Sequence, residues 1–129
     1  MPTPMKYDTK VRAGEHLIFE VHPALSRAPG LLLTGKKYVT GTVLGMITAS
    51  KKLVEWDPAA SDGSQNVAGV LYDERDATAA DAKCVYNKAL SVMMPSKLSW
   101  KAGLTDANKA AGLAQLDAKH ISMSAELGD

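Results

Sequence analysis

The stretch GTVLGMITASKKLVEWDPAASDGSQNVAGVLY, residues 41–72, decides the fold class. It holds three runs of apolar and β-branched residues, 42–48, 52–56 and 67–72, separated by Ala-Ser-Lys and by a loop of small and polar residues. Runs of this length, bounded by Gly, Pro, Asp and Ser, predict consecutive antiparallel strands. Gly45 and Gly69 lie inside the runs and indicate bulges or close backbone approach in a tightly bent small barrel. We expect the core of the domain to include Val43, Leu44, Leu53, Val54, Trp56, Val70 and Leu71.

Outside this stretch, the pattern predicts further short strands and one long helix. Strands are expected at 16–22, 83–86, 89–93 and 121–123, with a turn or loop at 24–30 and a polar loop at 73–81. Residues 105–119 predict the helix, because Thr105 or Asp106 can cap its first turn. Its apolar stripe recurs at helical spacing and consists of Ala107, Ala110, Ala111, Leu113, Ala114 and Leu116.

Length and composition bound the class of protein. A chain of 129 residues is expected to form one domain. The formal charge of +1, with both signs interspersed, gives no basic face for nucleic acid. The single cysteine excludes an internal disulfide and a multi-cysteine zinc site. No apolar run of about 18 residues and no signal pattern occur, so we expect no membrane contact and cytoplasmic synthesis.

The N-terminal segment, residues 1–15, differs in composition from the domain expected over 16–129. It contains two prolines, alternating charges and hardly any clustered apolar residues. Such a segment buries too little surface to offset its ordering entropy, which favours a mobile arm over an ordinary frayed terminus. Fully extended, it would reach about 50 Å.

Side chains that could carry chemistry occur in ordinary contexts. In a strand over 16–22, His16, Glu20 and His22 share one face, and the opposite face is apolar: Leu17, Phe19 and Val21. This pattern favours a solvent-facing polar stripe over a metal site.

The remaining candidates predict no catalytic site and no cofactor. The carboxylates of residues 57, 62, 73, 74 and 76 stand in turn contexts, and Cys84 reads as a small buried hydrophobe. No nucleophile elbow and no phosphate-binding glycine motif occurs. The sequence therefore makes no case for an enzyme.

The order of segments resembles the head decoration proteins of tailed bacteriophages, the lambda-type capsid-stabilising family. The residues that carry the resemblance are Gly41 to Gly45, Lys52 to Asp57, Asp62-Gly63, Val67 to Leu71, Ser26-Arg27, and the late Ala-rich helix followed by His120-Ile121. It covers the chain from about residue 16 to 121.

This resemblance implies a mainly β domain with a β-clip-like core and one helix in the C-terminal region. It implies a homotrimer on the outer surface of the expanded capsid, at local threefold sites, where it bridges major capsid subunits against the pressure of packaged DNA. It also implies a virion location after synthesis in the host bacterial cytoplasm. The family's N-terminal arm, loose in the free protein, becomes ordered on the capsid. Here the arm residues would be Lys6, Tyr7, Lys10, Val11, Arg12, Leu17, Ile18 and Phe19. Such an arm could add a strand to a capsid sheet edge.

Two other classes stay open at this point. A small β-barrel module that binds carbohydrate would need Trp56 and Trp100 exposed side by side. An enzyme would need a pocket that holds two of Asp57, Asp73, His22 and His120 with shifted pKa values. The head decoration protein ranks first, the binding module second and the enzyme third.

Overall fold

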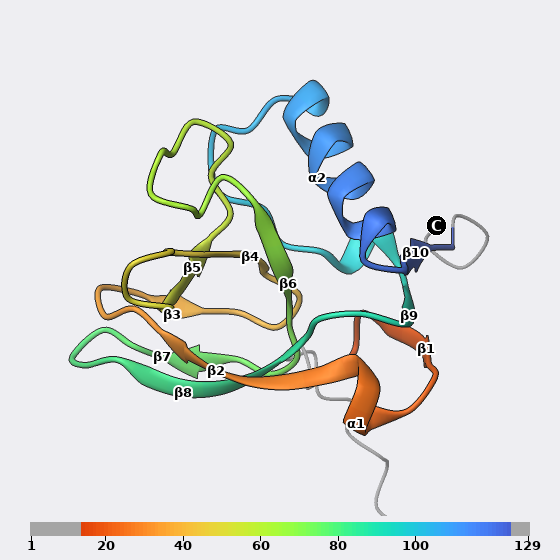
Figure 1. Cartoon of the computed structure of the whole chain (residues 1–129), viewed down its shortest axis with the longest axis horizontal. Helices are drawn as coiled ribbons and strands as arrows, with labels where there is room; N and C mark the ends of the chain where they lie inside the picture. The colour runs from red at the N-terminus through yellow and green to blue at the C-terminus, as the bar shows by residue number, and fades with distance from the viewer. Residues whose placement is uncertain (1–13, 125–129) are drawn as a thin grey trace, which may run out of the picture.

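A closed barrel of five strands forms the centre of the molecule in the computed structural model, which describes residues 14–124 (Figure 1). Around the barrel the order is β2 (Arg27–Leu32), β5 (Leu53–Glu55), β4 (Val43–Met46), β6 (Val67–Leu71) and β8 (Ala82–Asn87). Neighbours pair antiparallel, except β2 with β5, which are parallel. The stretch 41–72 supplies β4, β5 and β6, so the predicted mainly β fold is confirmed.

Two glycines let the barrel bend as tightly as it does. The β4–β6 register shifts between Leu44 and Gly45, and a Cβ on Gly45 would overlap the backbone oxygen of Ser64. On β6, a Cβ on Gly69 would overlap the backbone oxygen of Asn87. The predicted bulge and close backbone approach are both present.

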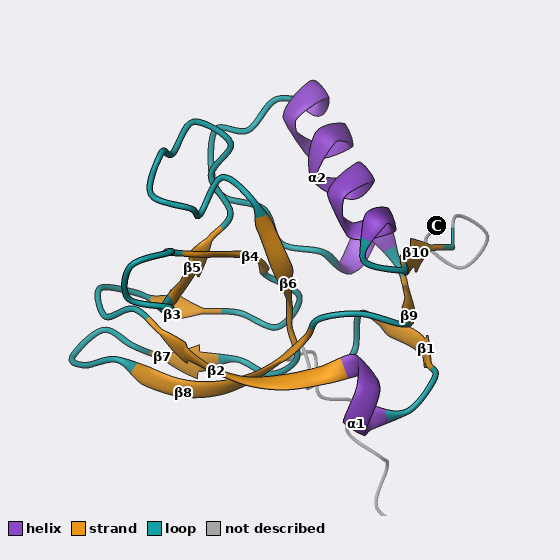
Figure 2. Cartoon of the chain, viewed as in Figure 1, coloured by secondary structure: helices purple, strands orange, loops and turns teal. Residues whose placement is uncertain are grey.

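Smaller elements surround the barrel (Figure 2). A second sheet has the order β1 (Leu17–Glu20), β9 (Ser91–Met93) and β10 (Ile121–Met123), with β9 antiparallel to β1 and parallel to β10. Strands β3 (Lys37–Tyr38) and β7 (Arg75–Asp76) form a two-stranded ribbon. The helices are α1 (Pro23–Ser26), the 3-10 turn η1 (Pro95–Lys97) and α2 (Asp106–Ala118).

The hydrophobic core has two parts that share β4 and β6. One part lies inside the barrel and includes Leu44 and Leu71, and the other lies between the barrel and α2 and includes Val43 and Val70. Adjacent residues of one strand point to opposite faces, so both faces of these strands are buried. This explains why the stretch is continuously apolar rather than alternating.

Most of the residues expected in the core are at most 1% exposed: Val43, Leu44, Leu53, Trp56, Val70 and Leu71. Val54 differs, because it is only half-buried and lines a surface groove. It alternates with Leu53 along β5, and only one face of this strand meets the barrel interior.

Helix α2 begins where the sequence predicts, but its buried face is different. The Thr105 side chain accepts a hydrogen bond from the Asn108 backbone N–H, and the Asn108 side chain accepts one from the Thr105 backbone N–H. The buried residues are Gly112 and Leu116, and Leu113 is half-buried. The predicted stripe is therefore wrong for its alanines, since four are exposed: Ala107, Ala110, Ala111 and Ala114.

Contact with two indole rings explains which face of α2 is buried. A Cβ on Gly112 would lie 2.6 Å from the Trp100 ring and 2.9 Å from the Trp56 ring. The helix thus packs against the two indole rings at its only glycine, and these four alanines are left exposed. Helical periodicity alone does not give a glycine this role.

Two predicted loops contain regular structure. Residues 24–30, expected as a turn or loop, form the end of α1 and the first part of β2. Pro23 fits the first turn of a helix, where its missing N–H costs nothing. Pro29 is tolerated in β2 because this strand meets β5 only at Leu32, so most of that edge is unpaired. The loop at 73–81 contains the short strand β7.

Candidate functional site

The described chain begins against the barrel at Gly14. The Gly14 N–H donates to the Tyr72 backbone oxygen at 2.8 Å, and the Leu17 N–H donates to the Gly14 oxygen at 2.9 Å. Gly14 has a φ of +70°, and a Cβ there would lie 2.8 Å from the Tyr72 ring. Glycine is the residue that accepts both the left-handed backbone and the close ring. Residues 14 and 15, assigned to the arm by composition, are therefore part of the described fold.

Strand β1 is paired within the domain. Leu17 lies opposite Met93 of β9, and Phe19 lies opposite Val92, with a register shift between Leu17 and Phe19. The Met94 N–H donates to the His16 backbone oxygen at 2.9 Å.

This pairing separates the eight residues expected in the arm into two groups. Leu17, Ile18 and Phe19 belong to β1. The others lie outside the described residues: Lys6, Tyr7, Lys10, Val11 and Arg12.

Several side chains of this segment lie opposite to the prediction. His16 is 1% exposed, whereas Phe19 and Val21 are 59% and 57% exposed. The expected solvent-facing polar stripe is therefore wrong for His16 and Glu20. Burying polar groups is tolerated here because hydrogen-bond partners on β2 and β8 receive them. His22 is exposed and accepts a hydrogen bond from the Ala24 N–H at the start of α1.

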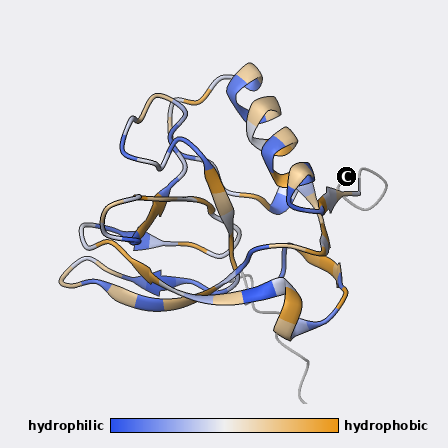
Figure 3. Ribbon diagram, viewed as in Figure 1, coloured by the Kyte–Doolittle hydropathy of each residue, from blue (hydrophilic) through white to orange (hydrophobic). Residues whose placement is uncertain are grey.

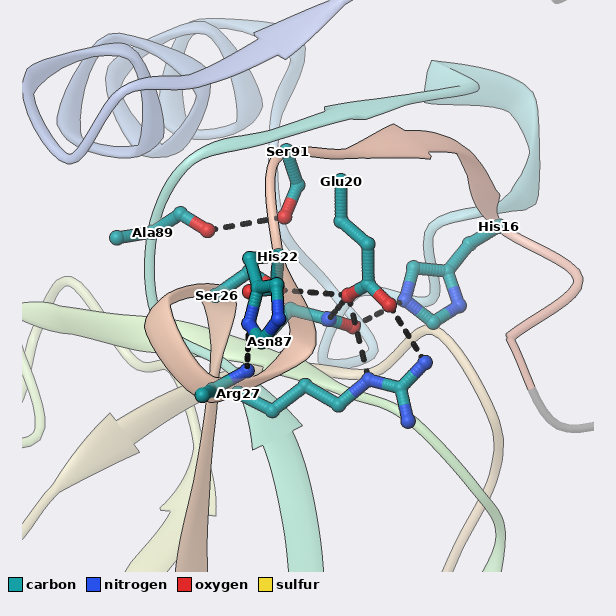
Figure 4. A network of polar contacts seen from close by, with 9 residues as sticks. His16, Glu20, His22, Ser26, Arg27, Asn87, Ala89 and Ser91 are labelled. Atoms are coloured by element: carbon teal, nitrogen blue, oxygen red, sulfur yellow. Dashed lines mark hydrogen bonds and ion pairs between the residues drawn. The ribbon is translucent and has the colours of Figure 1, made fainter.

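Glu20 is the centre of a polar network beneath β1 (Figure 4). Its carboxylate accepts hydrogen bonds from Ser26 Oγ at 2.7 Å, from Arg27 Nη2 at 2.6 Å and Nε at 3.2 Å, and from Asn87 Nδ2 at 3.4 Å. Burial acts to raise the pKa of Glu20, but the hydrogen bonds from Arg27 and Ser26 outweigh it and hold the pKa below its ordinary value. The Arg27 guanidinium also lies 4.0 Å from the centre of the Tyr72 ring. We call Glu20, Ser26, Arg27 and Asn87 the Glu20 network.

His16 adjoins the Glu20 network through Asn87. Its Nε2 lies 2.9 Å from Asn87 Oδ1, and its Nδ1 is buried with no hydrogen-bond partner among the described residues. Burial lowers the pKa of His16, while the Asn87 hydrogen bond and the Glu20 charge act in the opposite direction without reversing the shift. The ring is held edge-on to Tyr72, 6.5 Å between centroids. His16 is thus a buried, neutral imidazole.

Three large apolar side chains between β1 and α1 face solvent. Phe19 lies in β1 and Val21 directly follows this strand. Leu25 of α1 is 54% exposed. Figure 3 shows the apolar colour over β1 and α1 at the outer edge of the molecule. Phe19 and Val21 also line a shallow hollow of about 160 Å³ with Leu90, Val92 and His120. We call Phe19, Val21 and Leu25 the N-terminal apolar patch.

The candidates for other chemistry do not come together in a reactive site. Lys101 Nζ donates to Asp57 at 2.8 Å, and this hydrogen bond lowers the pKa of Asp57. Asp57 and His120 line separate hollows. Cys84 is buried, which raises its pKa to about 11 and makes the thiolate nucleophile scarce at neutral pH. Within residues 14–124, no group of three or more His, Cys, Asp or Glu side chains is arranged to hold a metal ion.

The indoles do not form an exposed carbohydrate platform. Trp56 is 1% exposed, and its Nε1–H donates to the Gln65 backbone oxygen at 2.7 Å. Trp100 is half-buried and packs edge-on against Trp56, with ring centroids 5.9 Å apart. Both rings are used by the packing of α2. In the described part of the chain, no helix combines the length and the hydropathy that crossing a bilayer requires.

The sequence model of the family described as bacteriophage lambda head decoration protein D matches residues 6–121. The chain belongs to this family. The match runs from eight positions ahead of Gly14 to the first residue of β10. A head decoration protein is a structural component of the phage capsid, so the predicted family and its capsid role are confirmed at this level. Among curated protein sequences, no relative matches the chain.

Sequence reasoning on this head decoration protein missed the partners in the Glu20 network. Asn87 was expected between two strands, and Arg27 in a loop, but the structure places them on β8 and β2. Only the barrel register, which sets Arg27 opposite Asn87, brings the two together beneath Glu20. Asn87 lies 60 or more positions from Arg27 and from Glu20, so no local spacing in the sequence predicts that these residues meet.

Proposed function

We propose that this head decoration protein forms a homotrimer on the outer surface of the expanded capsid, at its local threefold sites. There it bridges subunits of the major capsid protein and holds the shell against the pressure of packaged DNA. The observation that carries the proposal is the family match over residues 6–121. Closed threefold symmetry would suit such a site. The chain would be made in the host bacterial cytoplasm and act on the virion.

Two parts of the chain would touch the capsid. The first is the segment ahead of Gly14, whose residues Lys10, Val11 and Arg12 would add a strand to a capsid sheet edge through backbone hydrogen bonds. Leu17, Ile18 and Phe19 would not act as part of a loose arm, because β1 is already paired to β9. They would anchor the arm, and Phe19 would present its side chain to the capsid.

The second part would be the N-terminal apolar patch. Three large side chains that are each more than half exposed gather within seven residues, close to the point where the arm leaves the domain. Exposed apolar patches of this kind mark interaction surfaces more often than isolated apolar residues do. Three arms and three patches on one trimer would bind with an avidity that one copy lacks.

Light scattering on the purified protein, followed by co-sedimentation with expanded heads, tests the proposal. A trimer that sediments with heads is the expected result. A monomer that stays in the supernatant would contradict the proposed assembly and the proposed capsid contact together.

Deletion of residues 1–12 tests the arm. The shortened protein is expected to keep its fold and its trimeric mass, because the deletion leaves every residue of the two described core clusters in place. It is expected to lose binding to heads. A folded, trimeric deletion variant that still decorates heads would remove the arm from the proposal.

The double variant Phe19→Ser, Val21→Ser tests the patch. Its head binding is expected to weaken by roughly tenfold or more, since each large side chain contributes about 1.5–3 kcal/mol when fully buried. The matched control is Val85→Ser, which changes an exposed apolar residue on β8 of the barrel. Equal binding by the patch variant and the control would place the contact elsewhere.

A further inference from the structure

We infer that His16 is a pH-sensitive residue that holds residues 14–21 on the barrel at neutral pH and releases them in acid. The inference concerns the free domain and goes beyond capsid binding. It rests on the hydrogen-bond geometry of one buried ring.

The Glu20 network determines which nitrogen of His16 carries the proton. Glu20 is ionised and accepts from Asn87 Nδ2, so the Asn87 amide is oriented with its Oδ1 toward His16. An acceptor at that position requires a donor on the ring, which makes Nε2 the protonated nitrogen. Nδ1 is left as the free acceptor, buried and without a partner among residues 14–124.

A second proton on His16 would therefore find no acceptor among residues 14–124. Protonation would create a buried N–H at Nδ1 that finds no hydrogen bond, together with a charge in a 1% exposed side chain. The Glu20 carboxylate is the one opposing charge on β1, but it is already engaged by Arg27 of β2 and Ser26 of α1. Tyr72, directly after β6, and Asn87 of β8 contribute uncharged groups. Opening the segment into water removes the penalty.

The contacts of the segment make this opening local. Among the described residues, the backbone hydrogen bonds that attach residues 14–21 outside β1 itself run from Gly14 to Tyr72, from Val21 to Leu90, and from Met94 to His16. None of these bonds closes the barrel. Loss of the His16 contact would thus loosen the anchor of the arm while β2, β4, β5, β6 and β8 stay paired.

The direction with pH follows from the lowered pKa of His16 in the folded state. Its contribution to holding the segment is complete above the ordinary histidine pKa and decreases as the pH falls below it. Glu20 does not share this window, because its own pKa is held below the ordinary carboxyl value.

Hydrogen exchange on the free protein tests the inference without any capsid. Protection factors of the Gly14, Leu17, Val21 and Met94 amides are expected to fall between about pH 7.5 and about pH 5, by at most roughly thirtyfold, the limit set by a histidine of ordinary pKa in the open state. The Leu71 and Tyr72 amides of the barrel, which donate to Thr42 and Val85, are the internal control and should change by less than about threefold.

His16→Gln should abolish the pH dependence, because glutamine can donate to Asn87 Oδ1 but does not titrate. His120→Asn is the matched control at an exposed histidine with a φ of +60°, a conformation that asparagine tolerates, and should behave as the unchanged protein. A pH dependence that persists in His16→Gln would overturn the inference. So would an equal loss of protection across the barrel.

Direct titration of the His16 ring by NMR covers the case in which His16→Gln does not fold. In the unchanged protein, His16 is expected to titrate at a pH below the ordinary histidine pKa. A midpoint for His16 at or above the ordinary histidine value would overturn the inference.

Discussion

The barrel and the β1–β9–β10 sheet differ in which side chains they bury. In the barrel, Leu44, Leu53 and Leu71 are fully buried, and the pattern of the sequence translates directly into packing. In the smaller sheet, His16 is buried under β1 while Phe19 is 59% exposed. A strand's hydropathy pattern therefore identifies two faces, but which face turns inward depends on what the rest of the fold offers as partners.

The largest effect should come from the core between the barrel and α2. Trp56→Ala is expected to lower the free energy of unfolding by roughly 3–5 kcal/mol, because the indole is buried and its Nε1–H is paired. Denaturant unfolding measures it, with Trp100→Ala as a half-buried control that should cost less. A loss below about 1 kcal/mol at Trp56 would show that this side chain behaves as a surface residue.

A methyl group on the inner surface of the barrel should have the next largest effect. Gly69→Ala is expected to cost about 1–3 kcal/mol or slightly more, since its Cβ would overlap the Asn87 backbone oxygen, which has little freedom to move. Ala80→Ser, at an exposed loop position, should stay within about 0.5 kcal/mol of the unchanged protein. If the two variants unfold at the same denaturant concentration, β6 tolerates a Cβ at position 69 and the close approach to Asn87 does not limit stability.

The polar interior beneath β1 should contribute less. Glu20→Gln is expected to cost about 1–2 kcal/mol at neutral pH, because it removes the charge that accepts from Ser26 and Arg27. Glu55→Gln, which breaks the surface ion pair with Lys36, should cost below about 1 kcal/mol.

The effect of Glu20→Gln should also depend on pH. The folded-state pKa of Glu20 is lowered, so its contribution is complete above the ordinary carboxyl pKa and is lost as the pH falls through the folded value. Unfolding curves at several acid pH values should show the two proteins converging. A constant difference would mean that the carboxylate charge is not the stabilising feature.

The exposed face of β1 should have the smallest effect on stability. Phe19→Ser is expected to change the free energy of unfolding by less than about 1 kcal/mol, since most of the ring already faces water. Leu71→Ser in the barrel should cost more than about 3 kcal/mol. Thermal unfolding of the two variants compares the faces directly. Similar losses would mean that the patch is covered, and the contrast between the two regions would fail.

The sequence by itself determined the strands of 41–72, the glycine contacts at Gly45 and Gly69, and helix α2 with its Thr105 cap. These features depend on local spacing, on turn residues and on the lack of a Cβ, which are all readable along the chain. The order of segments also indicated the family that the match over 6–121 establishes.

Only the tertiary structure decided which face of β1 and of α2 is buried. The alanines of α2 are exposed because Gly112 lets the helix approach Trp100 and Trp56. His16 is buried and Glu20 is half-buried because the barrel register brings Arg27 and Asn87 to the same place. Burial of a polar group depends on partners that are distant in sequence, so its free energy is set by the assembled fold and not by the local pattern.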